Sequence, residues 1–401
     1  MTIKEIKTYL IIIFISIFFS LYLSEIYLTF YVKGGKHFWH DTTYKAKIYK
    51  KLTGKEYDTR SISDVYRELV AKNQNTAITF PPTSKYKKKF FSLSGVSNAK
   101  TIFCNESGYF SNYQSDRYGF NNPDSEWDSK EIEYLLVGDS YAHGACVNRP
   151  HDFASVLRKL SKKSVISLGY MGNGPLNEYA SLREYIPKNV KNIIWMFYEE
   201  NDLRDLSFEI KNKILLKYIE DKNFSQNLKS KQDKLDFYLK EKIENELIVS
   251  KNNEEYWKSY YTTKKVVLRF LRLDKTKNFF TSVNKKKYSF NNAKSLEEFK
   301  NILFLTKKLA DENNSNLHFV YLGSYYRYKS NFFSNHIFLS NYSKIVKIVN
   351  DLDVPLIDTN EAFFAKEKNP IDYFPFARYS HYTVEGYNKL SSLIYRLTKK
   401  K

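Results

Sequence analysis

Five short apolar runs alternate with amphipathic segments, and this alternation constrains the fold more than any other feature of the sequence. The runs cover residues 134–137, 165–168, 193–197, 317–322 and 354–357. Segments of helical periodicity begin at about residue 152, cover 174–186 and 294–313, lie near 342–352, and begin again at 383. Strand–helix–strand units of this kind place parallel strands side by side under helices. The pattern therefore predicts a parallel sheet covered on both faces.

The first 32 residues predict a membrane anchor. Residues 8–23 carry no charge, and the apolar character continues to Val32 with Glu25 as the one interruption. About 20 such residues suffice for a helix to cross a bilayer. No small-x-small cleavage site follows the run, so we interpret it as an uncleaved signal anchor that contacts the lipid bilayer through residues 8–32.

The rest of the chain divides into two predicted regions. Residues 33–130 are irregular and contain a proline-bearing break, which predicts a neck and an N-terminal cap. Residues 131–401 contain the α/β pattern, interrupted at about 205–292 by a lysine-rich helical insertion. Ser295 and Glu298 have the spacing of a capping box, which predicts that the helix after the insertion begins at Ser295.

The net charge of +20 raises the question of a nucleic-acid partner. The excess lysine is spread along the whole chain, without zinc-ligand spacing, a recognition-helix pattern or an arginine cluster. We therefore predict no nucleic-acid partner and no metal site, and leave open an acidic partner such as an anionic membrane surface or a charged glycan.

Four candidate site positions follow the predicted strands or precede the last helix. In open α/β sheets, ligands bind outside the carboxyl ends of the strands. The four positions are Ser140 in "GDSYAHG", Gly172 in "LGYMGNGPLNE", Asn201 in "FYEENDLRD" and His381 in "YFPFARYSHYTVEGYNKL". Together they offer a nucleophile, a backbone and a side-chain oxyanion donor, and a base. Taken alone, Ser140 could also be no more than the N-cap of a helix.

This order of motifs resembles the SGNH/GDSL hydrolase family, and the wider sequence looks like a bacterial membrane-anchored subgroup. The resemblance implies a flavodoxin-like three-layer α/β/α sandwich and serine esterase or acyltransferase chemistry without a metal or other cofactor. It implies Ser140 as nucleophile and His381 as general base. The implied oxyanion donors are the Ser140 backbone N–H, the Gly172 backbone and the Asn201 side chain.

Two positions depart from the family pattern. Glu199 stands where the third motif has glycine, and Arg378 stands three residues before His381, where the family has aspartate. Three hypotheses follow. A backbone carbonyl orients His381 in a catalytic dyad, Asp372 or Asp358 reaches it from elsewhere, or the protein is inactive.

The two cysteines, Cys104 and Cys146, allow one disulfide. Such a bridge would hold an N-terminal segment beside the turn that carries Ser140. A pair of buried free thiols is an equal alternative.

The expected function is hydrolysis or transfer of O-acyl groups, O-acetyl above all, on cell-envelope glycans. The alternative is an inactive SGNH-fold scaffold that binds glycan or assembles an envelope complex. Lysines 4 and 7 precede the anchor and lysines 33, 36, 45 and 47 follow it, which by charge alone would place the body in the cytoplasm. Because envelope glycans lie outside, we instead expect a single-pass protein of the inner (cytoplasmic) membrane with a periplasmic or extracellular body.

Overall fold

The computed structural model describes residues 2–30, 42–72, 74–82, 90–260, 263–285, 292–329 and 332–399. The chain forms two compact units. The smaller unit comprises Met1–Tyr44 and Glu244–Ser289, and the larger comprises Lys45–Ile243 and Phe290–Lys401.

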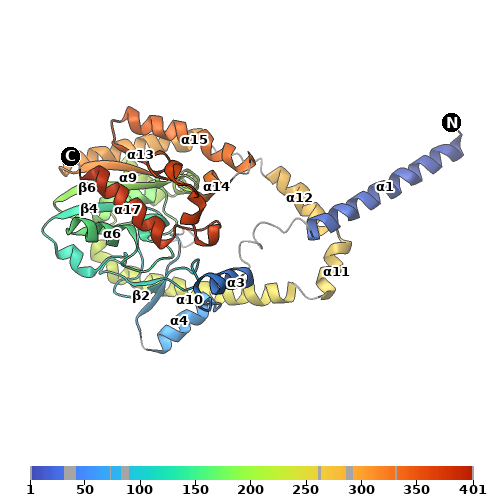
Figure 1. Ribbon diagram of the computed structural model, residues 1–401, viewed down its shortest axis with the longest axis horizontal. Helices are drawn as coiled ribbons and strands as arrows, with labels where there is room; N and C mark the ends of the chain where they lie inside the picture. Colours follow the sequence, from blue (N-terminus) through green and yellow to red (C-terminus); the bar gives the residue numbers. More distant parts are fainter. Residues whose placement is uncertain are drawn as a thin grey trace. The chain divides into compact units, whose positions relative to one another are not determined.

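The larger unit is built on a five-stranded sheet (Figure 1). Its strands are β4 (Ile132–Gly138), β5 (Val165–Ser167), β6 (Val190–Tyr198), β7 (Asn316–Leu322) and β8 (Leu356–Asp358). The order is β5-β4-β6-β7-β8, and every neighbouring pair is parallel. This is the strand order of flavodoxin-like sheets, in which the first strand of the chain lies between the second and the third. The predicted parallel sheet is confirmed.

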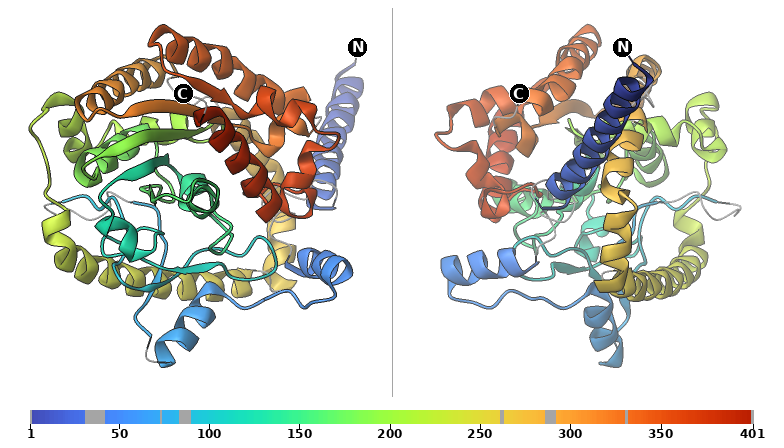
Figure 2. Two further views of the ribbon diagram at one scale, coloured as in Figure 1. Left: turned by 60° about the vertical axis from the view of Figure 1, so that its left-hand side comes forward. Right: turned by 90° about the vertical axis from the view of Figure 1, so that its right-hand side faces the viewer.

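Helices cover both faces of this sheet (Figure 2). The helices α6 (Phe153–Ser161) and α17 (Val384–Thr398) pack side by side on one face (Figure 1). The other face carries α7 (Pro175–Tyr185), α8 (Asp202–Glu209), α13 (Asn292–Glu312) and α15 (Phe332–Asp351). Alternate strand residues face opposite layers: Leu135 joins the core formed with α7 and α13, whereas the Tyr134 hydroxyl lies 3.0 Å from Thr398 Oγ1 of α17. The three-layer α/β/α sandwich is confirmed.

Short elements complete the ends of the strands. They are α5 (Ser140–His143), α14 (Tyr325–Tyr328), α16 (Thr359–Ala362), η3 (Phe364–Lys366), η4 (Pro370–Tyr373) and η5 (Pro375–Ala377). Thr383 caps α17 by accepting the backbone N–H of Gly386, so this helix begins where the sequence predicts. The capping box predicted at Ser295 is wrong, because α13 already begins at Asn292 and Ser295 lies buried within it.

The larger unit takes in most of the region predicted as a neck. It contains α4 (Ile62–Ala71), η1 (Asp124–Asp128) and a small sheet of β1 (Thr76–Ile78), β2 (Lys100–Ile102) and β3 (Asn112–Gln114), and α3 (Thr42–Thr53) begins just before it. The β1–β2 pair is parallel and the β2–β3 pair is antiparallel. Residues 45–130 are therefore part of the larger unit and not a separate neck.

The predicted insertion is also shorter than expected. The helices α9 (Lys213–Glu220) and η2 (Lys229–Lys231), and α10 (Gln232–Tyr260) as far as Ile243, belong to the larger unit. Leu215 and Tyr218 of α9 join its core, and Arg183 of α7 donates to backbone carbonyls at the end of α9 and just beyond it. These contacts hold residues 205–243 against the sandwich, so the part outside the larger unit is 244–289.

The smaller unit contains α1 (Ile3–Phe30), α11 (Thr263–Leu271) and α12 (Asp274–Lys285). Within α1, the span Ile3–Leu28 contains an 18-residue stretch with a mean hydropathy of 2.1, and it is long and apolar enough to cross a membrane. It is the one such helix among the described residues, which agrees with a single N-terminal anchor.

Candidate active site

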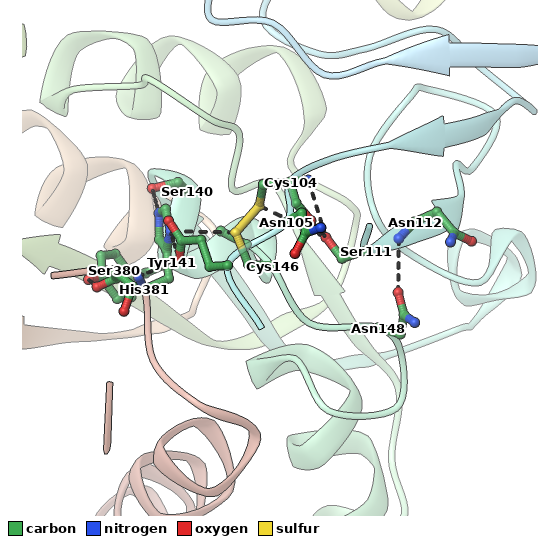
Figure 3. Close-up of a disulfide and its surroundings, with 12 residues drawn as sticks. Cys104, Asn105, Ser111, Asn112, Ser140, Tyr141, Cys146, Asn148, Ser380 and His381 are labelled. Atoms are coloured by element: carbon green, nitrogen blue, oxygen red, sulfur yellow. Dashed lines mark hydrogen bonds and ion pairs between the residues drawn. A yellow bond between two sulfur atoms is a disulfide. The ribbon is translucent and has the colours of Figure 1, made fainter. Parts of the chain in front are cut away.

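Ser140 begins the short helix α5 directly after β4, but it does not cap that helix. The cap is Asp139, whose Oδ1 accepts the Tyr141 backbone N–H at 2.8 Å. The Ser140 side chain is therefore available for another partner. His381 Nε2 lies 2.9 Å from Ser140 Oγ, and the two side chains point toward each other in Figure 3.

The side chain that orients His381 is Glu106, which sequence reasoning missed. Its Oε2 lies 3.1 Å from His381 Nδ1 and accepts the His381 backbone N–H at 2.7 Å. The three side chains thus form a carboxylate–imidazole–hydroxyl chain, although the carboxylate comes from the segment after β2 instead of from the residue three before the histidine.

The predicted orienting acids are wrong. Asp358 caps α16 by accepting the Asn360 backbone N–H at 2.8 Å, and it also accepts the Tyr342 hydroxyl. Asp372 lies exposed in η4. The sequence expectation was that one of these two carboxylates reaches His381. Asp358 is instead held by its local hydrogen bonds, and Asp372 is exposed to solvent.

A disulfide between Cys104 and Cys146 holds Glu106 in place (Figure 3). Their Cα atoms are 5.0 Å apart, and Cys146 Sγ lies 3.8 Å from His381 Nδ1. The Asn105 side chain accepts the Gly108 N–H at 3.0 Å, which closes a tight turn around Glu106. The bridge thus fixes this turn to the chain just beyond α5. One signal in the sequence could have identified Glu106. It stands two residues after Cys104, a cysteine that could form a disulfide with Cys146 beside this site.

The charges of the site suit a general base. Burial opposes the charge on both partners, but the attraction between them is stronger. The pKa of His381 is therefore raised, by the Glu106 charge and hydrogen bond with smaller effects of Asp139 and Glu200, and the pKa of Glu106 is lowered. With Nδ1–H donating to Glu106, neutral His381 presents the Nε2 lone pair to the Ser140 hydroxyl.

Asn201 precedes α8 as its N-cap residue, and its side chain contacts Asp139, the residue before Ser140. Its Nδ2 donates to Asp205 Oδ2 at 2.9 Å and to Asp139 Oδ2 at 3.3 Å, and Ser140 Oγ is also 3.3 Å from that Asp139 oxygen. Asp139 Oδ2 is therefore a common hydrogen-bond partner of the Asn201 amide and the Ser140 hydroxyl. An amide donor at this place is the kind of group that an oxyanion hole requires.

The turn that carries Gly172 is fastened to α5 by a buried histidine. His143 Nδ1 accepts the Met171 N–H at 3.1 Å, and its Nε2 lies 2.7 Å from the Tyr113 hydroxyl. Burial lowers the pKa of His143 to about 3, so the ring is neutral and serves as a structural link. Gly172 has φ +77°, and a Cβ there would lie 2.8 Å from Pro81 Cβ, so the turn requires glycine.

Glu209 of α8 accepts hydrogen bonds from the backbone where this turn ends and α7 begins. The helix α7 begins after Gly174, which has no side chain to cap it. Glu209 supplies the acceptors: Oε1 binds the Gly174 N–H at 2.6 Å and Oε2 the Leu176 N–H at 3.0 Å. Burial raises the pKa of Glu209 to about 8, despite these hydrogen bonds.

Glu199, which replaces the family's glycine, has a structural role. Its carboxylate is buried, forms an ion pair with Arg327 of α14, and accepts the Ser324 backbone N–H at 2.7 Å. Glu199 thus ties the end of β6 to the start of α14, and the Asn201 amide still donates to Asp139, the residue before Ser140.

We expect Asn201→Ala to lower kcat for ester hydrolysis by about 10²–10³-fold, the usual effect of removing one oxyanion donor. KM should change much less, because the oxygen becomes anionic only during the reaction. Steady-state kinetics on a small acetyl ester measure both. A variant with wild-type kcat would exclude Asn201 from the oxyanion hole.

Comparison with known proteins gives structural similarities only: neither a family model nor a curated protein matches the sequence. The solved structure of a putative lipolytic protein of the G-D-S-L family from Desulfitobacterium hafniense DCB-2 is 9% identical, with 67% of this chain and 99% of that chain covered and a TM-score of 0.36. The acetyl xylan esterase AlAXEase is 10% identical over 66% of this chain and 99% of its own, with a TM-score of 0.36. A lipase/acylhydrolase from Enterococcus faecalis is 12% identical over 67% and 95%, with a TM-score of 0.34.

The strand order and the placement of the four motifs decide the fold assignment. Ser140 follows β4, Gly172 follows β5, Asn201 follows β6, and His381 precedes α17, all on a sheet of order β5-β4-β6-β7-β8. This chain has the SGNH/GDSL hydrolase fold. Within that fold it carries an orienting carboxylate, Glu106, that enters from the N-terminal part of the chain.

Proposed function

We propose that this protein is a serine-dependent acyl ester hydrolase or acyltransferase that acts on O-acyl groups of cell-envelope glycans, with O-acetyl as the preferred group. The observation that carries the proposal is the hydrogen-bonded chain from Glu106 through His381 to Ser140, with distances of 3.1 and 2.9 Å. A hydroxyl held this way by a neutral imidazole is the arrangement of an activated nucleophile.

In the proposed reaction, Ser140 Oγ attacks the ester carbonyl while His381 Nε2 takes the hydroxyl proton. The backbone N–H groups of Ser140 and Gly172 and the Asn201 amide stabilise the oxyanion. The alcohol leaves with the proton from His381, and the acyl group remains on Ser140. Water or a second alcohol then attacks this ester with His381 again as base, which gives hydrolysis or transfer. Throughout, Glu106 stabilises the imidazolium.

The glycan substrate is proposed from the architecture of the chain. A catalytic unit that follows a membrane anchor works close to a bilayer, where envelope glycans and their lipid-linked forms are found. The competing hypothesis of an inactive scaffold depended on the missing aspartate before His381. Glu106 supplies a carboxylate to the same imidazole nitrogen, so that argument for inactivity no longer applies.

A fluorophosphonate probe tests the proposed chemistry, because it phosphonylates an activated serine and leaves ordinary serines intact. We expect stoichiometric labelling of the full-length protein at Ser140, identified by peptide mass, and no labelling of Ser140→Ala. An unlabelled, folded wild-type protein would favour the scaffold.

We further propose that α1 anchors the protein in the cytoplasmic membrane and that the catalytic unit faces the periplasm or the exterior. The disulfide beside the site supports export, because such bonds persist in oxidising compartments. We expect Cys104 and Cys146 to resist alkylation in protein prepared from cells without reductant, as measured by intact mass. Two alkylated thiols would contradict export.

A further inference from the structure

Glu25, the one charge within the apolar run of α1, has a specific partner. Its side chain is 1% exposed, and it accepts the backbone N–H groups of Lys275 at 3.0 Å and Thr276 at 2.7 Å. Both belong to the first turn of α12, where such groups have no partner within the helix. The carboxylate therefore caps α12 from the side of α1, and the two helices lie side by side at this point (Figures 1 and 2).

The end of α11 contacts α1 as well. Tyr22 donates its hydroxyl to the Leu271 carbonyl at 2.9 Å, and its ring centroid lies 5.7 Å from that of Phe270. Because Tyr22 and Glu25 are three residues apart, they share one face of α1. The turn between α11 and α12 is thus fastened to one short stretch of this face.

The position of Glu25 along α1 sets its depth in a bilayer. Residues 8–24 carry no charge and, at about 1.5 Å per residue, cover roughly 26 Å, close to the hydrocarbon thickness of about 30 Å. Glu25 then lies at the boundary between acyl chains and headgroups, where a carboxylate needs hydrogen-bond donors. Since the donors come from α12, the α11–α12 turn must lie at the same boundary.

The surface of α11 and early α12 suits that boundary. Its apolar side chains include Val267, Leu268 and Leu271, which are 52%, 42% and 56% exposed. Basic residues are interspersed among them: Arg269, Arg272, Lys275 and Lys277. Helices that lie on anionic membranes typically insert apolar side chains at the acyl boundary, while neighbouring cations contact the lipid phosphates.

We propose that residues 263–277 are a second membrane contact, a surface element that binds the headgroup region of an anionic phospholipid bilayer and is fastened to the anchor by Glu25. The element is independent of the ester chemistry. It depends on α1 spanning the bilayer, which the experiment reports separately.

The test uses the full-length chain with single cysteines, because Cys104 and Cys146 are already bonded to each other. An environment-sensitive fluorophore is placed at Leu268→Cys in vesicles of phosphatidylcholine and phosphatidylglycerol that contain lipids with a nitroxide near the headgroup. The matched control is Phe237→Cys, which replaces a 76% exposed apolar residue of the larger unit. We expect roughly threefold more quenching at Leu268→Cys than at the control. The same fluorophore at Phe14→Cys, within α1, reports insertion of the anchor by a blue shift of its emission, because Phe14 would lie deep among the acyl chains.

Two further comparisons define the outcome. Glu25→Ala should reduce quenching at Leu268→Cys by about half, whereas Glu25→Gln, which keeps one acceptor oxygen, should reduce it less. Pure phosphatidylcholine should also reduce it, because the basic residues then lose their anionic partners. Blue-shifted emission at Phe14→Cys without quenching at Leu268→Cys would overturn the proposal and favour a protein partner or a second copy on this surface. Unshifted emission at Phe14→Cys would disprove the anchor and this inference together.

Discussion

Ser140→Ala is expected to abolish turnover of a small acetyl ester, with a loss of about 10⁴-fold or more in kcat, because no other group replaces the attacking oxygen. The thermal unfolding midpoint should barely move. The helix cap at this turn is Asp139, so the substitution removes no capping bond. Steady-state kinetics and thermal unfolding on the purified full-length protein measure the two effects.

The matched control is Ser392→Ala, which replaces an exposed helical serine of α17 whose hydroxyl donates to the Asn388 carbonyl one turn earlier in the same helix. It should leave turnover unchanged. His381→Ala should match the loss of Ser140→Ala, and the double variant should lose no more, since the two act as a unit. Wild-type turnover in Ser140→Ala would refute the proposed nucleophile.

Glu106→Gln is expected to lower kcat/KM by about 10²–10⁴-fold, because the amide cannot stabilise the imidazolium that forms during attack and can hold the wrong tautomer. The matched controls are Asp372→Asn and Asp358→Asn. Both remove a negative charge from the C-terminal part of the chain without touching His381, and asparagine still caps α16 at position 358. These controls should stay within about twofold of wild type.

Glu106→Gln should also change the pH profile of activity in a way that a merely structural role of Glu106 would not. Activity requires neutral His381, so it rises as pH increases through the raised pKa of this histidine. Removing the Glu106 charge leaves burial, which lowers the pKa of His381, opposed only by the smaller effects of Asp139 and Glu200, so the acidic limb of the pH profile should move to lower pH. An unmoved limb would mean that Glu106 does not interact with the base.

The positions of the proposed nucleophile, oxyanion donors and base could be predicted because each stands next to a regular element. Ser140, Gly172 and Asn201 directly follow strands whose apolar runs are visible in the sequence, and His381 precedes a helix with a recognisable cap at Thr383. Parallel strands bring their carboxyl ends to one edge of a sheet, so these positions converge whatever the intervening chain does.

Glu106 could not be predicted in the same way, since no strand or helix places it. It reaches His381 because a disulfide and a tight turn fold an irregular segment against α5, and such a contact depends on partners distant in sequence. Asp372 and Asp358 were plausible from sequence proximity alone, but local hydrogen bonds and exposure direct them elsewhere.

The sequence by itself determined the parallel sandwich, the apolar N-terminal helix and the order of the candidate site residues, because strand periodicity, hydrophobic length and the residues next to strand ends are local properties. The tertiary structure alone decided the carboxylate that contacts His381, the role of Glu25 as the cap of α12, and the inclusion of residues 45–130 in the larger unit. Each of these depends on groups that approach through space across long stretches of chain. A buried carboxylate accepts hydrogen bonds from the donors that packing places next to it, and the periodicity of the sequence does not indicate which donors those are.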